Sequence, residues 1–107
     1  MDYKQRVLNG LSKKFPANTF VWSNAKENKF DFCPRFALIV DGHETDILFN
    51  PEIAQDLYHG LECSRLGIEP FHPDSLMIPI VPERMEPVVN ELVALYTNAV
   101  LDHLAAT

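Results

Sequence analysis

Apolar and polar positions follow two different periods along the chain, and each change of period marks an expected element. Apolar residues recur at helical spacing over residues 2–14, which predicts an amphipathic helix. Residues 19–23 and 29–33 carry alternating aromatic positions, which predict two strands separated by a polar turn at 24–28. Pro34 is expected to break the ladder or to force a bulge before the chain continues as a strand.

A hairpin is the most closely constrained element. Asp41-Gly42 tolerates the positive φ angles of a type I′ turn, so it is expected to join strands at 36–40 and 43–49. A two-residue turn also sets the register, which would oppose Ala37 to Asp46. The residues expected on the core face are Phe36, Leu38, Val40 and Ile47. The other face is mixed and is expected to lie in water; its charged members are Arg35, Glu44 and Asp46.

The second half of the chain predicts two helices and a strand between them. Asn50 and Pro51 are an N-cap and a first-turn proline, and they start a helix that should end at Leu66 with Gly67 as its C′ residue. A proline-rich connection follows at 68–75, and Pro79 confines a short strand at 76–81 to an edge or a bulge. The last helix should start at Glu83 or Pro87 and run to Ala105.

The resulting order is α-β-β-β-α-β-α, which predicts a single α+β domain with an antiparallel sheet and helices packed on one face. The apolar positions of the last helix cover about half of its circumference, more than a helix on one sheet face usually needs. Val93 and Val100 lie on one flank of this stripe, and Leu95 lies on the other. The extra width indicates a homodimer in which the uncovered flank meets a second copy.

Charge is distributed unevenly along the 107 residues. Residues 1–35 carry seven basic and three acidic side chains, whereas residues 36–107 carry two basic and twelve acidic ones, for a net charge of −6. An acidic surface repels phosphates, which disfavours direct binding of DNA or RNA. No apolar run is long enough to span a membrane, and the charged start shows no secretion signal, so we expect a cytoplasmic protein with free thiols at Cys33 and Cys63.

The chemistry-bearing residues do not form a motif that names a reaction. One ridge of the second helix carries Glu52, Asp56, His59 and Cys63, where His59 and Cys63 could hold two corners of a zinc site. A structural zinc site needs about four ligands, and no CxxC motif or second His/Cys pair is present. Glycine-rich phosphate loops are also absent from the sequence. We therefore predict no catalytic residue, no bound metal and no cofactor.

Two families resemble the chain in element order. The order α-β-β-β-α-β is similar to the core of restriction-endonuclease-like nucleases, which use an acid on the second strand and a Glu-x-Lys motif on the third. The matching segment here is Glu44-Thr45-Asp46, which lacks the lysine, and no lysine follows Lys29, so the resemblance does not imply an active nuclease. Order and acidity also resemble class I type III secretion chaperones, which look like small acidic dimers, although one of their strands is missing here.

These observations predict a non-enzymatic, acidic protein-binding module that forms a homodimer and has a secretion-chaperone-like, immunity-like or inhibitor-like role. The expected contact residues are Leu95, Val93, Val100, Arg35, Glu44 and Asp46. A small metal-dependent hydrolase or nuclease-like enzyme is an alternative, and its candidate groups are His59, Cys63 and His72. A small-ligand sensor is a further alternative, with a cavity lined by Trp22, Phe71 and Tyr96.

Overall fold

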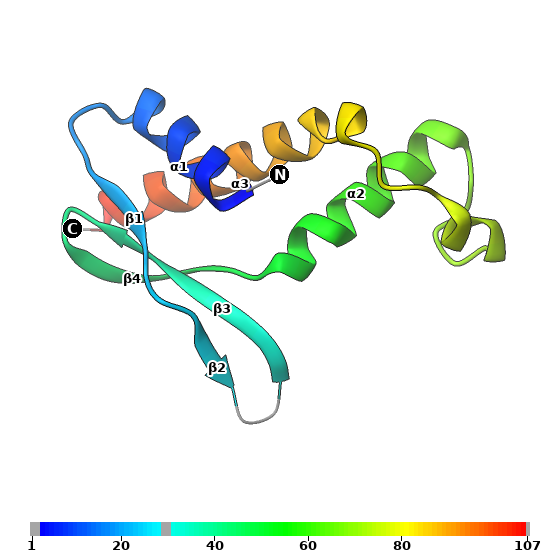
Figure 1. The fold of residues 1–107 in the computed structure, drawn as a ribbon. Helices are drawn as coiled ribbons and strands as arrows, with labels where there is room; N and C mark the ends of the chain where they lie inside the picture. Colours follow the sequence, from blue (N-terminus) through cyan, green and yellow to red (C-terminus); the bar gives the residue numbers. More distant parts are fainter. Residues whose placement is uncertain (1–2, 29–30, 107) are drawn as a thin grey trace.

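The structure is a computed structural model that describes residues 3–28 and 31–106, without the side chains of residues 27, 28 and 31–33. Its elements, in chain order, are α1 (Tyr3–Lys14), β1 (Phe20–Trp22), β2 (Lys26–Asn28), β3 (Asp31–Val40), β4 (His43–Phe49), α2 (Pro51–Leu66), the short 3-10 helices η1 (Pro73–Met77) and η2 (Pro82–Arg84), and α3 (Glu86–Ala105). The predicted α+β class is confirmed, because the helices pack on an antiparallel sheet (Figure 1).

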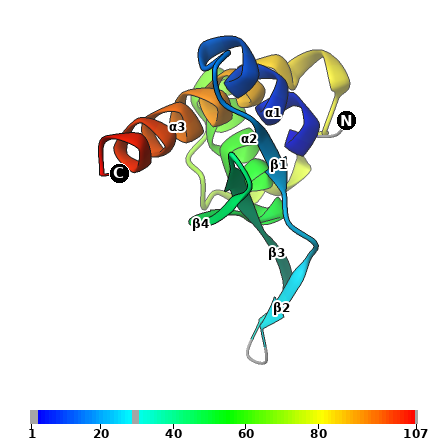
Figure 2. The same ribbon diagram turned by 90° about the vertical axis from the view of Figure 1, so that its left-hand side faces the viewer.

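The long strand β3 lies at the centre of the sheet. Its carboxyl half pairs with β1 on one side and with β4 on the other, and its amino half pairs with β2. Because β1 and β2 follow the same edge of β3, the sheet is effectively three-stranded and antiparallel throughout. The β2–β3 end extends beyond the layer of helices (Figure 2).

The core lies between the sheet and the three helices. Val7 and Leu11 of α1, Leu38 of β3, and Leu92 and Val100 of α3 are all fully buried there. At its centre, the aromatic rings of β1, β4 and α3 meet in one cluster: Trp22 and Tyr96 lie edge to face at 5.6 Å between ring centroids, and both contact Phe49. The opposite sheet face is left to solvent, where Val21 and Leu48 are exposed.

The predicted hairpin is confirmed at its tip. Asp41 and Gly42 have φ angles of 52° and 83°, as a type I′ turn requires, and Val40 pairs with His43. The Asp41 carboxylate accepts hydrogen bonds from the backbone N–H of Thr19 and from Asn18, which attaches the tip to the start of β1 and lowers the pKa of Asp41. Phe36 and Ile47 pack against the core beside the buried Leu38 and Val40, as predicted.

The register at the base of the hairpin was predicted wrongly. Ala37 pairs with Leu48 instead of Asp46, because two extra residues of β4 form an irregularity between Glu44 and Leu48. The Thr45 hydroxyl donates a hydrogen bond to the carbonyl oxygen of Leu38 and accepts one from the Ile47 N–H, so a side chain replaces the missing ladder bonds. Turn chemistry alone carries no signal for this hydroxyl contact.

Both long helices end where the sequence predicts. The side chain of Asn50 accepts a hydrogen bond from the N–H of Glu52 at the start of α2, and Gly67 closes α2 in the left-handed conformation with φ 69°. Pro87 lies in the first turn of α3. The helix expected at residues 2–14 forms as α1, and Asp2 lies outside the described residues.

Two predictions for the strands were wrong. Residues 76–81 form no strand: η1 ends at Met77, and residues 78–81 are extended without a ladder partner in the described structure. Both family resemblances depend on an element order that includes this strand, so part of their basis is missing. Part of the expected turn at 24–28 is the strand β2, which pairs with β3. The bulge expected at Pro34 is confirmed, because the β2–β3 register shifts between the pairs Lys26–Arg35 and Asn28–Asp31 and residues 32–34 of β3 lie opposite a single residue of β2.

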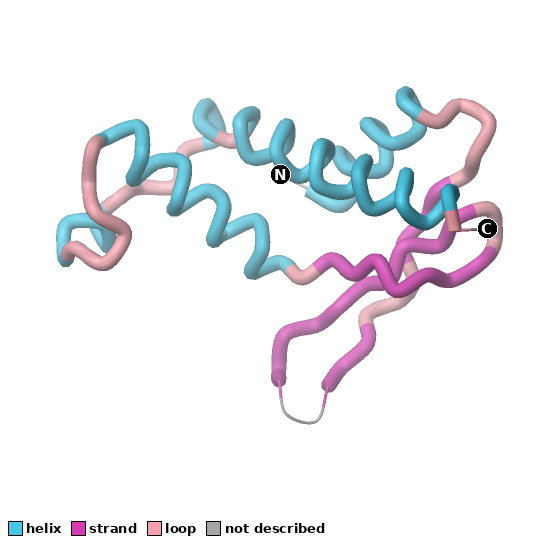
Figure 3. The backbone as a smooth tube through the Cα atoms, turned by 180° about the vertical axis from the view of Figure 1, so that it is seen from behind, coloured by secondary structure: helices cyan, strands magenta, loops and turns pink. Residues whose placement is uncertain are grey.

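The connection between α2 and η2 lies at the far end of α2, away from the sheet (Figure 3). We call residues 68–81 the arm. It contributes to the elongated shape of the molecule, whose extents are 45, 34 and 24 Å.

Candidate protein-binding site

The three predicted contact residues of α3 have different environments. Val100 is fully buried in the core of its own chain. Val93 faces α1 at the closest approach of the two helices, where a Cβ atom added to Gly10 would lie 2.8 Å from both γ-carbons of Val93. Leu95 is half-exposed, as is Leu101 further along α3. The flank that the fold leaves uncovered is therefore the one that carries Leu95.

The charged contact residues predicted on the hairpin lie on or beside the outer sheet face. Glu44 is exposed and forms an ion pair with Lys26 of β2 across that face. Arg35 is half-buried and pairs with Lys26 in the strand register. Asp46 is exposed within the irregular segment of β4. This face has mixed charge, with Val21 and Leu48 as its exposed apolar members.

The arm carries the most exposed apolar side chains among the described residues. Phe71 is 100% exposed, Leu76 85% and Met77 80%, and Ile80 is also largely exposed. Large apolar side chains scattered singly on a surface are common, whereas here four exposed ones lie within ten residues.

Polar contacts fix the backbone beneath these side chains. At the end of α2, the N–H of Ile68 donates a hydrogen bond to the carbonyl oxygen of Cys63. This bond fixes the direction in which the arm leaves the helix. His72 caps η1 by accepting a hydrogen bond from the N–H of Asp74 through Nδ1. The buried Ser75 hydroxyl donates to the carbonyl oxygen of Pro70 at 2.9 Å and closes the loop on itself.

Tyr58 attaches the far end of the arm to α2. Its buried hydroxyl donates to the carbonyl oxygen of Pro79 at 2.8 Å and accepts from the N–H of Val81 at 3.1 Å. These two bonds replace the strand pairing that the sequence suggested. Because one hydroxyl satisfies both backbone groups, the segment stays extended without a neighbouring strand.

A buried carboxylate joins α2 to η2 beside this attachment. Glu62 accepts two hydrogen bonds from Arg65, at 2.7 and 3.1 Å, and one from Arg84 at 3.0 Å. The bond from Arg65 is the largest cause that lowers the pKa of Glu62, and the bond from Arg84 acts in the same direction. The segment directly after the arm is therefore fixed to α2 by a charge-assisted bond between Glu62 and Arg84, which lie 22 positions apart.

The arm was not predicted as an exposed surface, because residues 76–81 were expected to form a strand at an edge or a bulge and Phe71 was placed in the connection before it. One signal was present: a proline-rich connection that is apolar at Phe71, Leu76, Met77 and Ile80 does not have the polar composition of an ordinary loop. The exposure of these four side chains could not be predicted, since it depends on the backbone path that Tyr58 fixes at Pro79 and Val81, beside Ile78, which packs against the core.

The polar ridge of α2 brings His59 and Cys63 close to each other. Glu52 and Asp56 are exposed, His59 is half-buried and Cys63 is buried with its Sγ atom 3.7 Å from Nε2 of His59. Within the described residues, no group of three or more His, Cys, Asp and Glu side chains is placed to hold a metal ion. The side chain of Cys33 lies outside the description.

The cavity expected for a ligand sensor does not form. Trp22 and Tyr96 pack against each other in the core, whereas Phe71 is fully exposed on the arm. These three rings therefore do not line one space, and that expectation was wrong.

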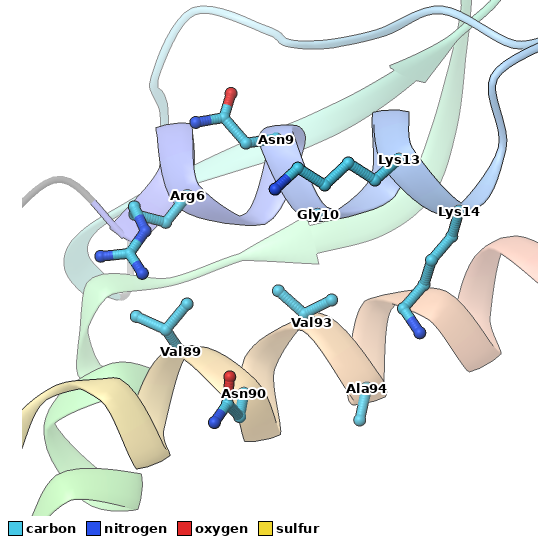
Figure 4. A pocket seen from close by; sticks show the side chains of 9 residues that line it. All are labelled: Arg6, Asn9, Gly10, Lys13, Lys14, Val89, Asn90, Val93 and Ala94. Atoms are coloured by element: carbon cyan, nitrogen blue, oxygen red, sulfur yellow. The ribbon is translucent and has the colours of Figure 1, made fainter.

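A separate open groove lies between α1 and α3 and has a volume of about 400 Å³ (Figure 4). Val89 and Val93 point from α3 toward α1, and Lys13 and Lys14 at the end of α1 reach over the groove. The remaining lining residues are Arg6, Asn9, Gly10, Asn90 and Ala94. We call this the α1–α3 groove; no carboxylate is among its lining residues.

Comparisons with protein-family models, with curated proteins and with solved structures gave no match to this chain. No helix within residues 3–28 and 31–106 is long and apolar enough to cross a membrane.

Proposed function

We propose that this chain is a non-enzymatic protein-binding module that forms a homodimer in the cytoplasm, and that the arm is its main association surface. The observation that carries the proposal is the exposure of Phe71, Leu76 and Met77 on a backbone fixed by buried hydrogen bonds. A binding surface that is already ordered loses less conformational entropy when a partner covers it.

Burial of the apolar side chains of the arm would contribute substantially to association. Complete burial of one Leu, Met or Phe side chain contributes about 1.5–3 kcal/mol. Burying three of them offsets a substantial part of the entropy that two molecules lose on association. Leu95 and Leu101 on α3, and Val21 and Leu48 on the outer sheet face, are further exposed apolar positions for a second protein partner.

Sedimentation equilibrium on the wild-type protein and on Leu76→Ser/Met77→Ser tests the proposal. We expect a wild-type dimer at high micromolar concentration. The double substitution should weaken association at least about tenfold, because a loss of about 1.4 kcal/mol already changes the dissociation constant by that factor. Circular dichroism should show an unchanged fold, since both side chains are exposed.

Leu101→Ser is the matched control. Leu101 is also an exposed leucine, but it lies on α3 and not on the arm. Its replacement should leave the association constant unchanged. A wild-type protein that stays monomeric at high micromolar concentration contradicts the dimer, and equal weakening by Leu101→Ser contradicts the role of the arm.

A further inference from the structure

We infer that the arm of one copy binds in the α1–α3 groove of a second copy, and that two copies exchange their arms reciprocally. The inference rests on the proposed dimer and names the surface that receives the arm. It follows from the complementary chemistry of two surfaces that lie on the same chain.

The α1–α3 groove is cationic around an apolar floor. Lys13 and Lys14 form no ion pair within the described part of the chain. Arg6, at the other end of the groove, binds Glu86 at 2.7 Å and keeps about a third of its side chain exposed. Between these charges the accessible apolar lining is the partly buried Val93 and the exposed Ala94, whereas Val89 is buried. A segment that brings both carboxylates and apolar side chains therefore complements the groove.

The arm brings both. Neither Lys nor Arg occurs between Arg65 and Arg84, whereas Glu69 and Asp74 are exposed beside the apolar side chains. The Glu69 side chain forms no ion pair within the described residues, and Asp74 faces only His72, at 3.6 Å. The uneven charge of the sequence thus reappears as two separate surfaces, a cationic groove on α1 and an acidic apolar arm after α2.

The groove is large enough for apolar side chains. Its volume of about 400 Å³ is more than ten times the roughly 30 Å³ that one water molecule occupies in the liquid. Gly10 contributes to the shape of the groove, because the absence of a Cβ atom there lets α1 approach Val93 closely.

One copy cannot fill its own groove with its own arm. Tyr58 and Glu62 attach the arm to α2, and the arm lies at the far end of that helix from the α1 side of the molecule (Figure 1). The contact must therefore be made between two copies. A reciprocal exchange uses both surfaces of both copies and closes as a two-fold dimer, whereas a one-way contact would continue into chains.

Two charge-reversed variants test this pairing. The groove variant is Lys13→Glu/Lys14→Glu, and the arm variant is Glu69→Lys/Asp74→Lys. Each variant alone places like charges opposite each other, so each should self-associate at least about tenfold more weakly than the wild type. An equimolar mixture should form a heterodimer, because both of its arm–groove contacts join opposite charges again. Sedimentation velocity at low and high salt measures both effects, and salt should weaken the heterodimer.

Net charge cannot explain a weaker self-association of the arm variant, because its smaller negative charge reduces the repulsion between copies. The two variants move the formal charge of −6 by four in opposite directions, so both remain negative and repel each other overall. Asp56→Lys/Asp102→Lys is the matched control for the arm variant, since it makes the same net change at exposed positions outside the arm. Neither its self-association nor its mixture with the groove variant should reproduce the effects of the arm variant.

A neutral variant separates loss of the pairing from unfolding of the end of α1 by the reversed charges. Lys13→Gln/Lys14→Gln should fold normally and should reduce the salt dependence of the wild-type dimer. The inference fails if the groove variants dimerise as the wild type does, or if the mixture yields no heterodimer. If the arm variant alone weakens the dimer, the proposed function stands and the groove is not the receiving surface.

Discussion

The two ends of this molecule place the same kinds of side chain in opposite environments. At the sheet end, Trp22, Phe49 and Tyr96 form an aromatic cluster within the core. At the arm end, Phe71 is fully exposed, while polar Ser75 and charged Glu62 are buried. The sheet end follows the usual arrangement of apolar residues inside and polar residues outside, and the arm reverses it.

The difference shows what holds each region together. Burial of apolar area stabilises the sheet end, and this contribution is non-directional. Directional bonds from Tyr58 and Ser75 fix the backbone of the arm, and Glu62 anchors η2 directly after it through Arg84, while Phe71, Leu76 and Met77 stay uncovered. A region built in this way can present apolar surface to a partner without collapsing onto its own chain.

The largest predicted contrast uses one substitution at two leucines. Leu92→Ala removes a fully buried side chain from the core and should lower the free energy of unfolding by about 2–5 kcal/mol. Leu76→Ala changes a side chain that is 85% exposed within its own chain and should change the monomer's stability by less than about 0.5 kcal/mol.

Urea unfolding at several protein concentrations measures this contrast. Extrapolation to low concentration separates the stability of one chain from the contribution of the dimer, because association shifts apparent stability by mass action. Equal losses at Leu92 and Leu76 in that limit would show that the arm packs inside its own chain, and the contrast between the two ends would disappear.

Local chemistry predicts much of the sheet end. Asp41-Gly42 at the hairpin tip, Asn50 at the start of α2 and Gly67 at its end all lie where the sequence places them. Each is determined by residues within a few positions, through a turn conformation or a cap. The irregular base of the hairpin was missed because it depends on a hydroxyl contact between Thr45 and Leu38.

The arm could not be predicted in the same way. Its shape depends on bonds between Tyr58 and Pro79 and between Glu62 and Arg84, which join residues 21 and 22 positions apart. No periodic pattern records such a pair. The apolar composition of residues 76–81 therefore predicted a strand. Polar groups distant in sequence determine the backbone of this segment instead, and it pairs with no strand in the described structure.

The second prediction compares how the wild type and a Glu62 variant lose stability at low pH. Its folded pKa is lowered by Arg65 and Arg84, so its stabilising contribution is complete above the pKa of an unfolded glutamate. That contribution is lost as the pH falls through the lower, folded pKa. Glu62→Gln should therefore destabilise the protein most near pH 7, and the difference from wild type should shrink steadily in acid below the ordinary pKa of glutamate.

Urea unfolding between pH 7 and pH 3 on wild type and Glu62→Gln checks this sign. Hydrogen exchange at the N–H of Val81, which binds Tyr58 beside the cluster, should report local loosening of the arm. We expect a smaller effect than that of Leu92→Ala, because both arginine side chains are more than a third exposed and water screens them. A difference that grows in acid would show that Glu62 is not held as a carboxylate.

The smallest predicted contrast compares alanine at two helical glycines. At Gly60 of α2 a new Cβ atom meets nothing within 4 Å, so Gly60→Ala should stabilise the protein by about 0.5–1 kcal/mol through helix propensity. Gly10→Ala in α1 gains the same propensity, but its Cβ atom would lie 2.8 Å from both γ-carbons of Val93. Because Val93 is β-branched and stiff, α1 must move away from α3, and the gain should be cancelled or reversed.

A double-mutant cycle tests whether contact with Val93 cancels the stabilisation expected from Gly10→Ala. In a Val93→Ala background the γ-carbons are gone, so Gly10→Ala should become stabilising by about the amount measured for Gly60→Ala. The free energy of unfolding of the four combinations gives the coupling between the two positions. If Gly10→Ala stabilises the wild type as strongly as Gly60→Ala does, α1 and α3 are not held in close contact at Val93. The spacing of the two helices at the floor of the α1–α3 groove would then not be fixed, as binding of the arm requires.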